Sequence, residues 1–134
     1  MADKRVIELA NSRGVFDPLT YGACEEKYIF EKQAEEFGYE RQTTFFSDLS
    51  IAEWYGLDGV RDTYNRVCKE WISDVKYFTE FVMALNWKCW EWHGRGYNEL
   101  AQLYSELYSA AYELGYEKYK DDDEKSSYFW RTLD

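Results

Sequence analysis

The segment 75–93 contains two side chains whose types and spacing suit nucleophilic chemistry. Cys89 and His93 are four residues apart, so they share one face if the segment is helical. A thiol beside an imidazole is the arrangement in which a base activates a cysteine nucleophile. No sequence typical of an oxyanion hole or a phosphate cradle accompanies the pair. We therefore expect Cys89 to be a core residue, His93 to cap the helix C-terminus and the protein not to be an enzyme.

The residues that bind metals and cofactors do not occur here in the required patterns. A structural zinc site needs four ligands, and the chain has three scattered cysteines and one histidine. A di-iron helical bundle needs Glu-x-x-His pairs, but the residue three positions before His93 is Trp90. The run Asp121–Glu124 lacks the alternation and the glycine of an EF-hand loop, and Gly94–Gly96 does not follow a strand as a phosphate loop does. The sequence therefore predicts no metal and no cofactor.

Acidic side chains outnumber basic ones, since 26 Asp and Glu stand against 16 Lys and Arg, a formal net charge of −10. Nucleic acids and anionic membranes are bound by clustered Lys and Arg, and the sequence has no such cluster. The charge therefore argues against direct binding to nucleic acid or to a membrane, and it favours a protein partner with a basic surface. The same charge also serves to keep an aromatic-rich protein in solution.

We expect a cytoplasmic protein. No apolar stretch is long enough to span a membrane, and residues 1–10 lack the apolar core of a signal peptide. Cys24, Cys68 and Cys89 cannot all pair and form no Cys-x-x-Cys motif, which fits buried thiols in a reducing compartment.

Apolar residues recur at helical spacing through most of the chain and predict an all-α fold, a compact bundle of five or six helices. The length suits one domain, residues 1–134, with one core. Residues 1–40 are expected to be an N-terminal helical extension with helices at Asp3–Arg13 and Tyr21–Phe37, and residues 43–134 the core region.

The helix Val75–His93 is rich in aromatic residues and apolar nearly all round, so we expect it at the centre of the bundle. Helices Asp58–Ser73, which Asp58 caps, and Asn98–Tyr119 are expected to flank it. A last short helix, capped by Ser126 and holding Tyr128–Trp130, is expected to dock on the body.

The segment Thr43–Phe46 is β-branched and aromatic, which predicts an extended piece. No second strand is found to pair with it. A short helix, Ile51–Tyr55, is expected to follow, capped by Asp48 or Ser50 and ended by Gly56.

The excess of aromatic residues is the most unusual feature, with 13 Tyr, 8 Phe and 6 Trp. A chain of this length has too little interior for all of them, and Tyr and Trp dominate protein-binding hot spots. Tyrosines at the edge of the core with their hydroxyls in water are the alternative. The predicted partner-binding residues are Trp54, Tyr55, Tyr108, Tyr112, Tyr116 and Tyr119, with the acidic run Asp121, Asp122, Asp123 and Glu124.

Several motifs in residues 43–134 carry a resemblance to a known group. They are Thr43–Ala52, Asp62–Arg66, Glu70-Trp71, Lys76-Tyr77, Thr79-Glu80, Leu85–Lys88 and Tyr128–Asp134. In these the chain resembles a group of small uncharacterised proteins encoded on conjugative elements and phages of gut bacteria. The resemblance implies a cytoplasmic accessory protein of a mobile element and implies no activity.

These observations favour a non-enzymatic acidic interaction protein of a mobile element or phage. Its partner would have a basic surface, as in a host nucleic-acid-binding defence protein such as a CRISPR or restriction effector, which it would inhibit with carboxylates in place of phosphates. The alternative is a self-assembling structural or regulatory helical module, for example a homodimer. A small enzyme that uses Cys89 and His93 is the third hypothesis.

Overall fold

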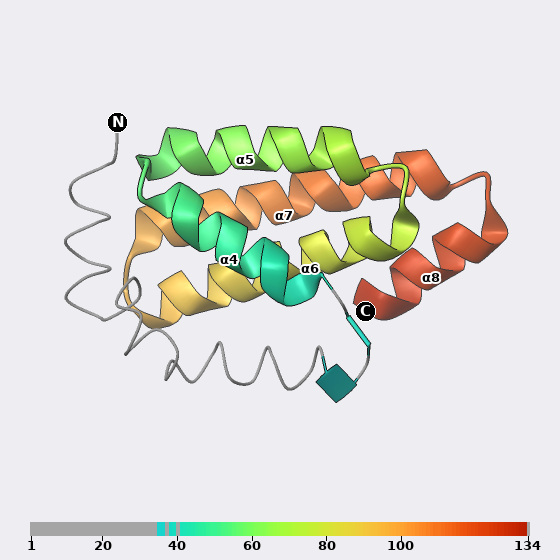
Figure 1. Ribbon diagram of the computed structural model, residues 1–134, viewed down its shortest axis with the longest axis horizontal. Helices are drawn as coiled ribbons and strands as arrows, with labels where there is room; N and C mark the ends of the chain where they lie inside the picture. The colour runs from blue at the N-terminus through green and yellow to red at the C-terminus, as the bar shows by residue number, and fades with distance from the viewer. Residues whose placement is uncertain (1–34, 37, 40, 134) are drawn as a thin grey trace. The chain divides into compact units, whose positions relative to one another are not determined.

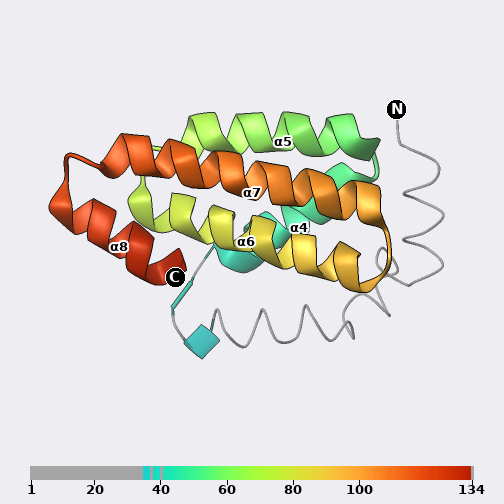
Figure 2. The same ribbon diagram turned by 180° about the vertical axis from the view of Figure 1, so that it is seen from behind.

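The computed structural model describes residues 35–36, 38–39 and 41–133 (Figures 1 and 2). This part of the chain is helical and has no strand, which confirms the predicted all-α class. Its helices are α4 (Gln42–Glu53), α5 (Gly56–Trp71), α6 (Val75–Gly94), α7 (Asn98–Tyr119) and α8 (Asp123–Leu133).

The chain divides into two compact units, and the boundary between Thr63 and Tyr64 lies inside α5. Most of the expected N-terminal extension, with the helix Asp3–Arg13, lies outside the described residues. The same holds for the expected helix Tyr21–Phe37, except for Glu35-Glu36, which are helical.

Residues Thr43–Phe46 lie in the first turns of α4, so the prediction of an extended segment is wrong. Phe45, Leu49 and Ala52 recur at helical spacing, and all three are buried. The threonines favour extended backbone only weakly, and burial of this apolar face decides the conformation.

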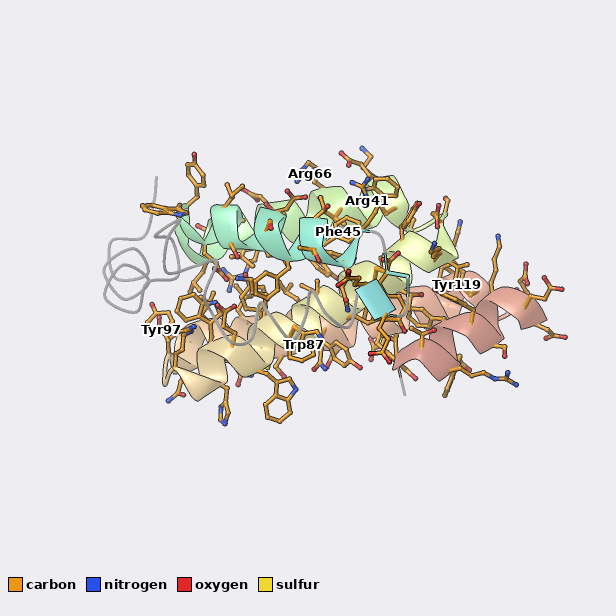
Figure 3. All side chains as sticks on the ribbon, turned by 60° about the horizontal axis from the view of Figure 1, so that its bottom comes forward. Arg41, Phe45, Arg66, Trp87, Tyr97 and Tyr119 are labelled. Atoms are coloured by element: carbon orange, nitrogen blue, oxygen red, sulfur yellow. The ribbon has the colours of Figure 1, made fainter. Side chains whose placement is uncertain are left out.

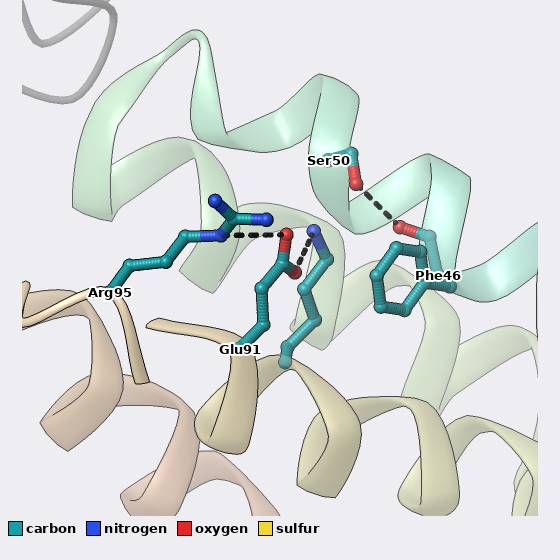
Figure 4. A network of polar contacts seen from close by, with 5 residues as sticks. Phe46, Ser50, Glu91 and Arg95 are labelled. Atoms are coloured by element: carbon teal, nitrogen blue, oxygen red, sulfur yellow. Dashed lines mark hydrogen bonds and ion pairs between the residues drawn. The ribbon is translucent and has the colours of Figure 1, made fainter. Parts of the chain in front are cut away.

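A separate helix at Ile51–Tyr55 is also a wrong prediction, because these residues form the end of α4 and the turn after it. Ser50 caps nothing, since its hydroxyl donates a hydrogen bond of 3.0 Å to the carbonyl of Phe46 inside the helix (Figure 4). Asp48 likewise lies within α4. Gly56 begins α5 with φ at 77°, a left-handed conformation that glycine adopts without steric cost.

The ends of α5 are set by different residues than expected. The helix begins at Gly56, so Asp58 is not its cap but lies in the first turn, where it pairs with Arg61 at 3.3 Å. α5 ends at Trp71, and residues 72–74 separate it from α6. Asp74 is the N-cap of α6, and its carboxylate accepts a hydrogen bond of 3.1 Å from the backbone N–H of Tyr77.

In the unit that begins at Tyr64, α6 packs against both α7 and α8. Figures 1 and 2 show α6 and α7 antiparallel and side by side, with α8 turning back at the end of α7 toward the start of α6. The second half of α5 also contributes, since the ring centroids of Tyr64 and Phe81 are 6.1 Å apart. α6 therefore contacts each of the other helices of this unit.

The apolar stripe expected on α6 is buried at Phe78, Phe81 and Leu85. The helix is not apolar all round, however. On the side opposite this stripe Trp90 is 63 % exposed, and the buried side chains of the helix include three charged residues, Glu80, Lys88 and Glu91. The last turns of α6 thus depart from the prediction of a nonpolar rod.

α7 has the predicted bounds, Asn98–Tyr119. α8 begins at Asp123, before the expected cap Ser126, which lies inside the helix. The carboxylate of Asp122 accepts a hydrogen bond of 3.1 Å from the backbone N–H of Lys125, so Asp122 fills the capping role. The acidic run Asp121–Glu124 therefore contains the residue that caps α8.

Candidate protein-interaction surface

Cys89 and His93 make separate contacts. The thiol of Cys89 donates a hydrogen bond of 3.5 Å to the carbonyl of Ala101 on α7, and burial raises its pKa. A raised pKa opposes formation of the reactive thiolate. His93 is exposed, and its ring contacts Trp90 edge to face at 6.2 Å. The two side chains share a helix face but have different neighbours.

Metal binding and membrane insertion find no support in the described residues. Within them, no group of three or more His, Cys, Asp or Glu side chains is arranged to hold a metal ion. No helix in the same part of the chain is long and apolar enough to cross a membrane.

Three tyrosines of α7 and one tryptophan of α8 form a continuous aromatic surface, which we call the aromatic strip. Tyr108 and Tyr112 have ring centroids 6.4 Å apart. Trp130 lies 6.0 Å from Tyr112 and 5.7 Å from Tyr116. Tyr116 and Trp130 are 43 % and 39 % exposed, and Tyr108 and Tyr112 are half-buried. Three of the predicted partner-binding residues are thus brought together.

Trp130 was not among the predicted partner-binding residues. Trp130 directly follows Phe129, which is fully buried, and this position could have indicated it. Successive residues of a helix point about 100° apart, so a residue beside the buried one lies at the edge of the core. Edge residues keep part of their ring in contact with water, as Trp130 does.

The aromatic strip packs on the buried ring of Phe129. The ring of Phe129 lies 5.6 Å from Tyr112 and stacks on Phe78 at 6.3 Å. At Gly115 of α7 the backbone comes so close to Phe129 that a Cβ there would overlap its ring. The absence of a side chain at Gly115 therefore lets α8 approach α7 and brings Trp130 to the tyrosines.

Tyr119 does not belong to the aromatic strip, contrary to the prediction that groups it with the other tyrosines. It is 2 % exposed, and its hydroxyl donates a hydrogen bond to the backbone carbonyl of Ile72. Figure 3 labels Tyr119, the last residue of α7. Burial raises the pKa of its phenol, and the negative charge of Asp74 adds to the shift. Three residues after Tyr116, the chain has turned toward Phe78, whose ring Tyr119 contacts at 6.4 Å. Tyr119 is a core residue and cannot contact a partner in the folded protein.

Trp54 and Tyr55 lie in the turn between α4 and α5, in the unit that ends at Thr63. Tyr55 is 58 % exposed, and Trp54 is half-buried. They are a feature of that unit and not part of the aromatic strip.

Four glutamates on α7 form a second surface feature, which we call the acidic row. They occur at intervals of seven, seven and four residues, so they share one face of the helix, and all four are exposed. At 1.5 Å per residue the first three are about 10 Å apart along the axis. Sequence reasoning missed this row, although its heptad spacing is visible in the chain. Its members are Glu99, Glu106, Glu113 and Glu117.

The acidic row borders the aromatic strip. Glu113 precedes Tyr116 by three residues, so these two side chains are neighbours on the helix surface. Glu117 is partly neutralised, because its carboxylate lies 2.9 Å from the ammonium of Lys120. All four residues of the predicted acidic run, Asp121 to Glu124, are exposed where α7 meets α8. The surface of α7 and α8 therefore offers ring faces beside carboxylates.

A buried ion pair on α6 is a further polar feature that sequence reasoning missed. The ammonium of Lys88 lies 3.1 Å from the carboxylate of Glu91, and both side chains are fully buried. The guanidinium of Arg95 lies 3.9 Å from the other carboxylate oxygen (Figure 4). The spacing i, i+3 and i+7 is the signal that places the three groups together. Because Lys88 and Glu91 are fully buried, they are not accessible to a ligand, and we assign their ion pair to the stability of the fold.

Comparisons with known proteins found no matching family model, no matching curated protein and no matching solved structure.

Proposed function

We propose that this protein acts by binding another protein through the exposed surface of α7 and α8, without catalysis. The observation that carries the proposal is the acidic row beside the aromatic strip. Such a surface combines long-range attraction for a basic partner with aromatic side chains that supply contact energy once water is excluded.

The partner class that fits the acidic row is a protein with a basic groove for nucleic acid. Such grooves bind phosphate charges along an extended path, and their binding depends steeply on salt. The acidic row presents a line of negative charges along α7, in the way that a nucleic-acid strand presents a line of phosphates. A helix in that groove would exclude the nucleic acid.

The resemblance of residues 43–134 to proteins of conjugative elements and phages supports a setting in which such an inhibitor is useful. Mobile elements meet host defences that bind nucleic acid, such as CRISPR and restriction effectors. We therefore propose that a defence effector of this kind is the target, and that the protein works in the host cytoplasm.

Self-assembly through the same surface is less consistent with the charges. In a symmetric dimer the same patch faces itself, so the acidic row of one copy would be enclosed with carboxylates of the other copy. Like charges at an interface are unfavourable. Sedimentation at micromolar concentration tests the alternative directly, since a dimer that persists at high salt and is lost on replacing Tyr116 would favour it.

The proposed function is tested by competition with DNA. Purified guide-loaded CRISPR nucleases and restriction endonucleases are mixed with a labelled DNA target, and DNA binding is followed by fluorescence anisotropy as the protein is added. We expect at least one effector to release its DNA, with an inhibition that weakens steeply as salt is raised.

Charge-matched variants separate the acidic row from net charge. Replacing Glu106, Glu113 and Glu117 by Gln should weaken the inhibition roughly tenfold or more. Replacing the exposed α5 acids Asp58 and Asp62 by Asn and Glu70 by Gln removes as much charge and should have a small effect. Equal losses in both triple variants, or no effector that releases DNA, would contradict the proposal.

A further inference from the structure

We infer that the aromatic strip is a recognition site for arginine side chains of a basic protein segment, in preference to lysine. The inference rests on the proposed function and specifies the chemistry by which the partner is recognised. It is carried by the arrangement of three partly exposed rings and of the carboxylates that border them.

The rings of Tyr112, Tyr116 and Trp130 do not form one flat patch. The plane of the Trp130 ring makes angles of 69° with Tyr112 and 66° with Tyr116. The indole therefore stands nearly perpendicular to both phenol rings, and the three rings offer walls of different orientation. A planar cation has a ring face to stack on, with a second ring beside it.

The face of an aromatic ring carries partial negative charge and attracts cations, most strongly for tryptophan. Trp130 and Tyr116 keep about two-fifths of their surface in contact with water, so their rings are accessible from solvent. The edge-to-face contacts also hold the rings in place before a partner arrives, which lowers the entropy lost on binding.

The carboxylate of Glu113 decides between the two basic side chains. It is exposed and lies three residues before Tyr116, so the two side chains are neighbours on the surface of α7. A guanidinium stacks on a ring by its plane and still donates hydrogen bonds from its edge to a carboxylate, whereas an ammonium is more strongly hydrated and gains less from stacking. Rings bordered by a carboxylate therefore favour arginine.

Competing occupants fit the strip less well. An apolar segment would have to desolvate the bordering carboxylates without replacing their interactions with water. The net charge of −10 opposes an acidic peptide or a nucleic acid in the same place. Charge complementarity thus selects a cationic segment of a protein.

The test compares oligoarginine and oligolysine peptides of equal length and charge. Binding of each labelled peptide to the full chain is measured by fluorescence anisotropy near physiological ionic strength. We expect oligoarginine to bind roughly three- to tenfold more tightly than oligolysine. Tyr116→Leu and Trp130→Leu should each reduce this preference while leaving oligolysine binding nearly unchanged.

Trp90→Leu is the matched control, because Trp90 is a more exposed tryptophan on α6 that is not part of the strip. Circular dichroism establishes that each variant is folded, and Tyr116→Leu keeps the test decisive if Trp130→Leu is not. Equal affinity of the two peptides for the wild-type protein, or an equal loss in Trp90→Leu, would overturn the inference.

The outcomes also separate this inference from the proposed function. If oligoarginine has no advantage but the glutamate variants still abolish the release of DNA from an effector, the arginine site is wrong and the acidic interaction surface stands. If the arginine preference is present but no effector releases its DNA, the strip binds arginine and the proposed class of target is wrong.

Discussion

The phenolic oxygen of Tyr119 lies 2.5 Å from the backbone carbonyl oxygen of Ile72 and donates a hydrogen bond to it. The contact joins the end of α7 to the turn between α5 and α6. The same phenol ring lies against Phe129 of α8 at 5.5 Å. One side chain thus ties together segments that lie 47 residues apart in the sequence.

Tyr119→Phe keeps the ring and removes only the hydroxyl. We expect the free energy of unfolding to fall by about 1 kcal/mol, the net value of one hydrogen bond. Tyr119→Ala also removes the buried ring and should cost about 3–5 kcal/mol. Urea unfolding followed by circular dichroism gives both values. A Phe variant as unstable as the Ala variant would contradict this division between hydroxyl and ring.

Gly115→Ala should destabilise the protein although alanine favours helices. The new methyl group would overlap the ring of Phe129, which is fully buried and has Phe78 stacked on it. Overpacking of this kind costs about 1–3 kcal/mol, more than the gain of about 1 kcal/mol in helix propensity.

Gly94→Ala is the control for Gly115→Ala. Gly94 is also in a helix, and a Cβ there has no neighbour within 4 Å. This variant should be neutral or stabilised by up to about 1 kcal/mol. Thermal unfolding of both variants side by side measures the difference. If both glycine variants gain stability, α8 does not pack on Gly115 as described.

Glu91→Ala should be among the most destabilising substitutions in α6. It removes the carboxylate that lies 3.1 Å from the buried ammonium of Lys88. Loss of one member of a buried ion pair costs about 3–5 kcal/mol. Glu70→Ala removes the carboxylate 3.5 Å from Arg66 in an exposed pair and should cost less than about 1 kcal/mol. Denaturant midpoints of the two variants compare them, and similar midpoints would show that burial does not govern the Lys88–Glu91 pair.

The sequence predicted the long helices well, because their periodicity is unbroken over many turns. The bounds of α7 coincide with the prediction, and α6 differs by one residue at its end. α4 was missed because Thr43–Phe46 favours extended backbone locally, while the buried spacing of Phe45 and Leu49 becomes visible only across the whole helix.

The candidate site was only partly predictable. Tyr116 and Tyr119 have the same side chain on the same helix, and the rotation of three residues separates an exposed ring from a buried one. A pattern of Lys and Glu also carries no information on burial. Lys88 and Glu91 have the same i, i+3 spacing as the exposed pair Asp58 and Arg61, and only the tertiary packing distinguishes them.

Cys89 should react slowly with alkylating reagents at neutral pH. Its thiol donates to the carbonyl of Ala101, and burial raises its pKa, so little thiolate is present to react. Labelling with iodoacetamide in the folded state, followed by peptide mass spectrometry, measures the rate against the same protein unfolded in urea. Labelling at Cys89 faster in the folded state than in the unfolded state would indicate an activated thiol and reopen the catalytic hypothesis.

We expect the free energy of unfolding to decrease at alkaline pH. Burial raises the pKa of Cys68 from 9.0 to about 11, and it also raises the pKa of Tyr64 and Tyr119. These groups keep their protons in the folded state at pH values where the unfolded chain has lost them. Above about pH 9 the unfolded state therefore binds fewer protons, and the free energy of unfolding decreases as pH rises.

Near neutral pH the same three groups are protonated in both states and contribute no pH dependence. Urea unfolding from neutral pH to about pH 11 measures the slope. Cys68→Ala and Tyr64→Phe should each flatten the alkaline slope, even where they lower stability at neutral pH. Tyr55→Phe, which removes an exposed hydroxyl, is the control and should leave the slope unchanged. A slope of opposite sign, or one that Cys68→Ala and Tyr64→Phe do not alter, would show that these buried groups do not govern alkaline unfolding.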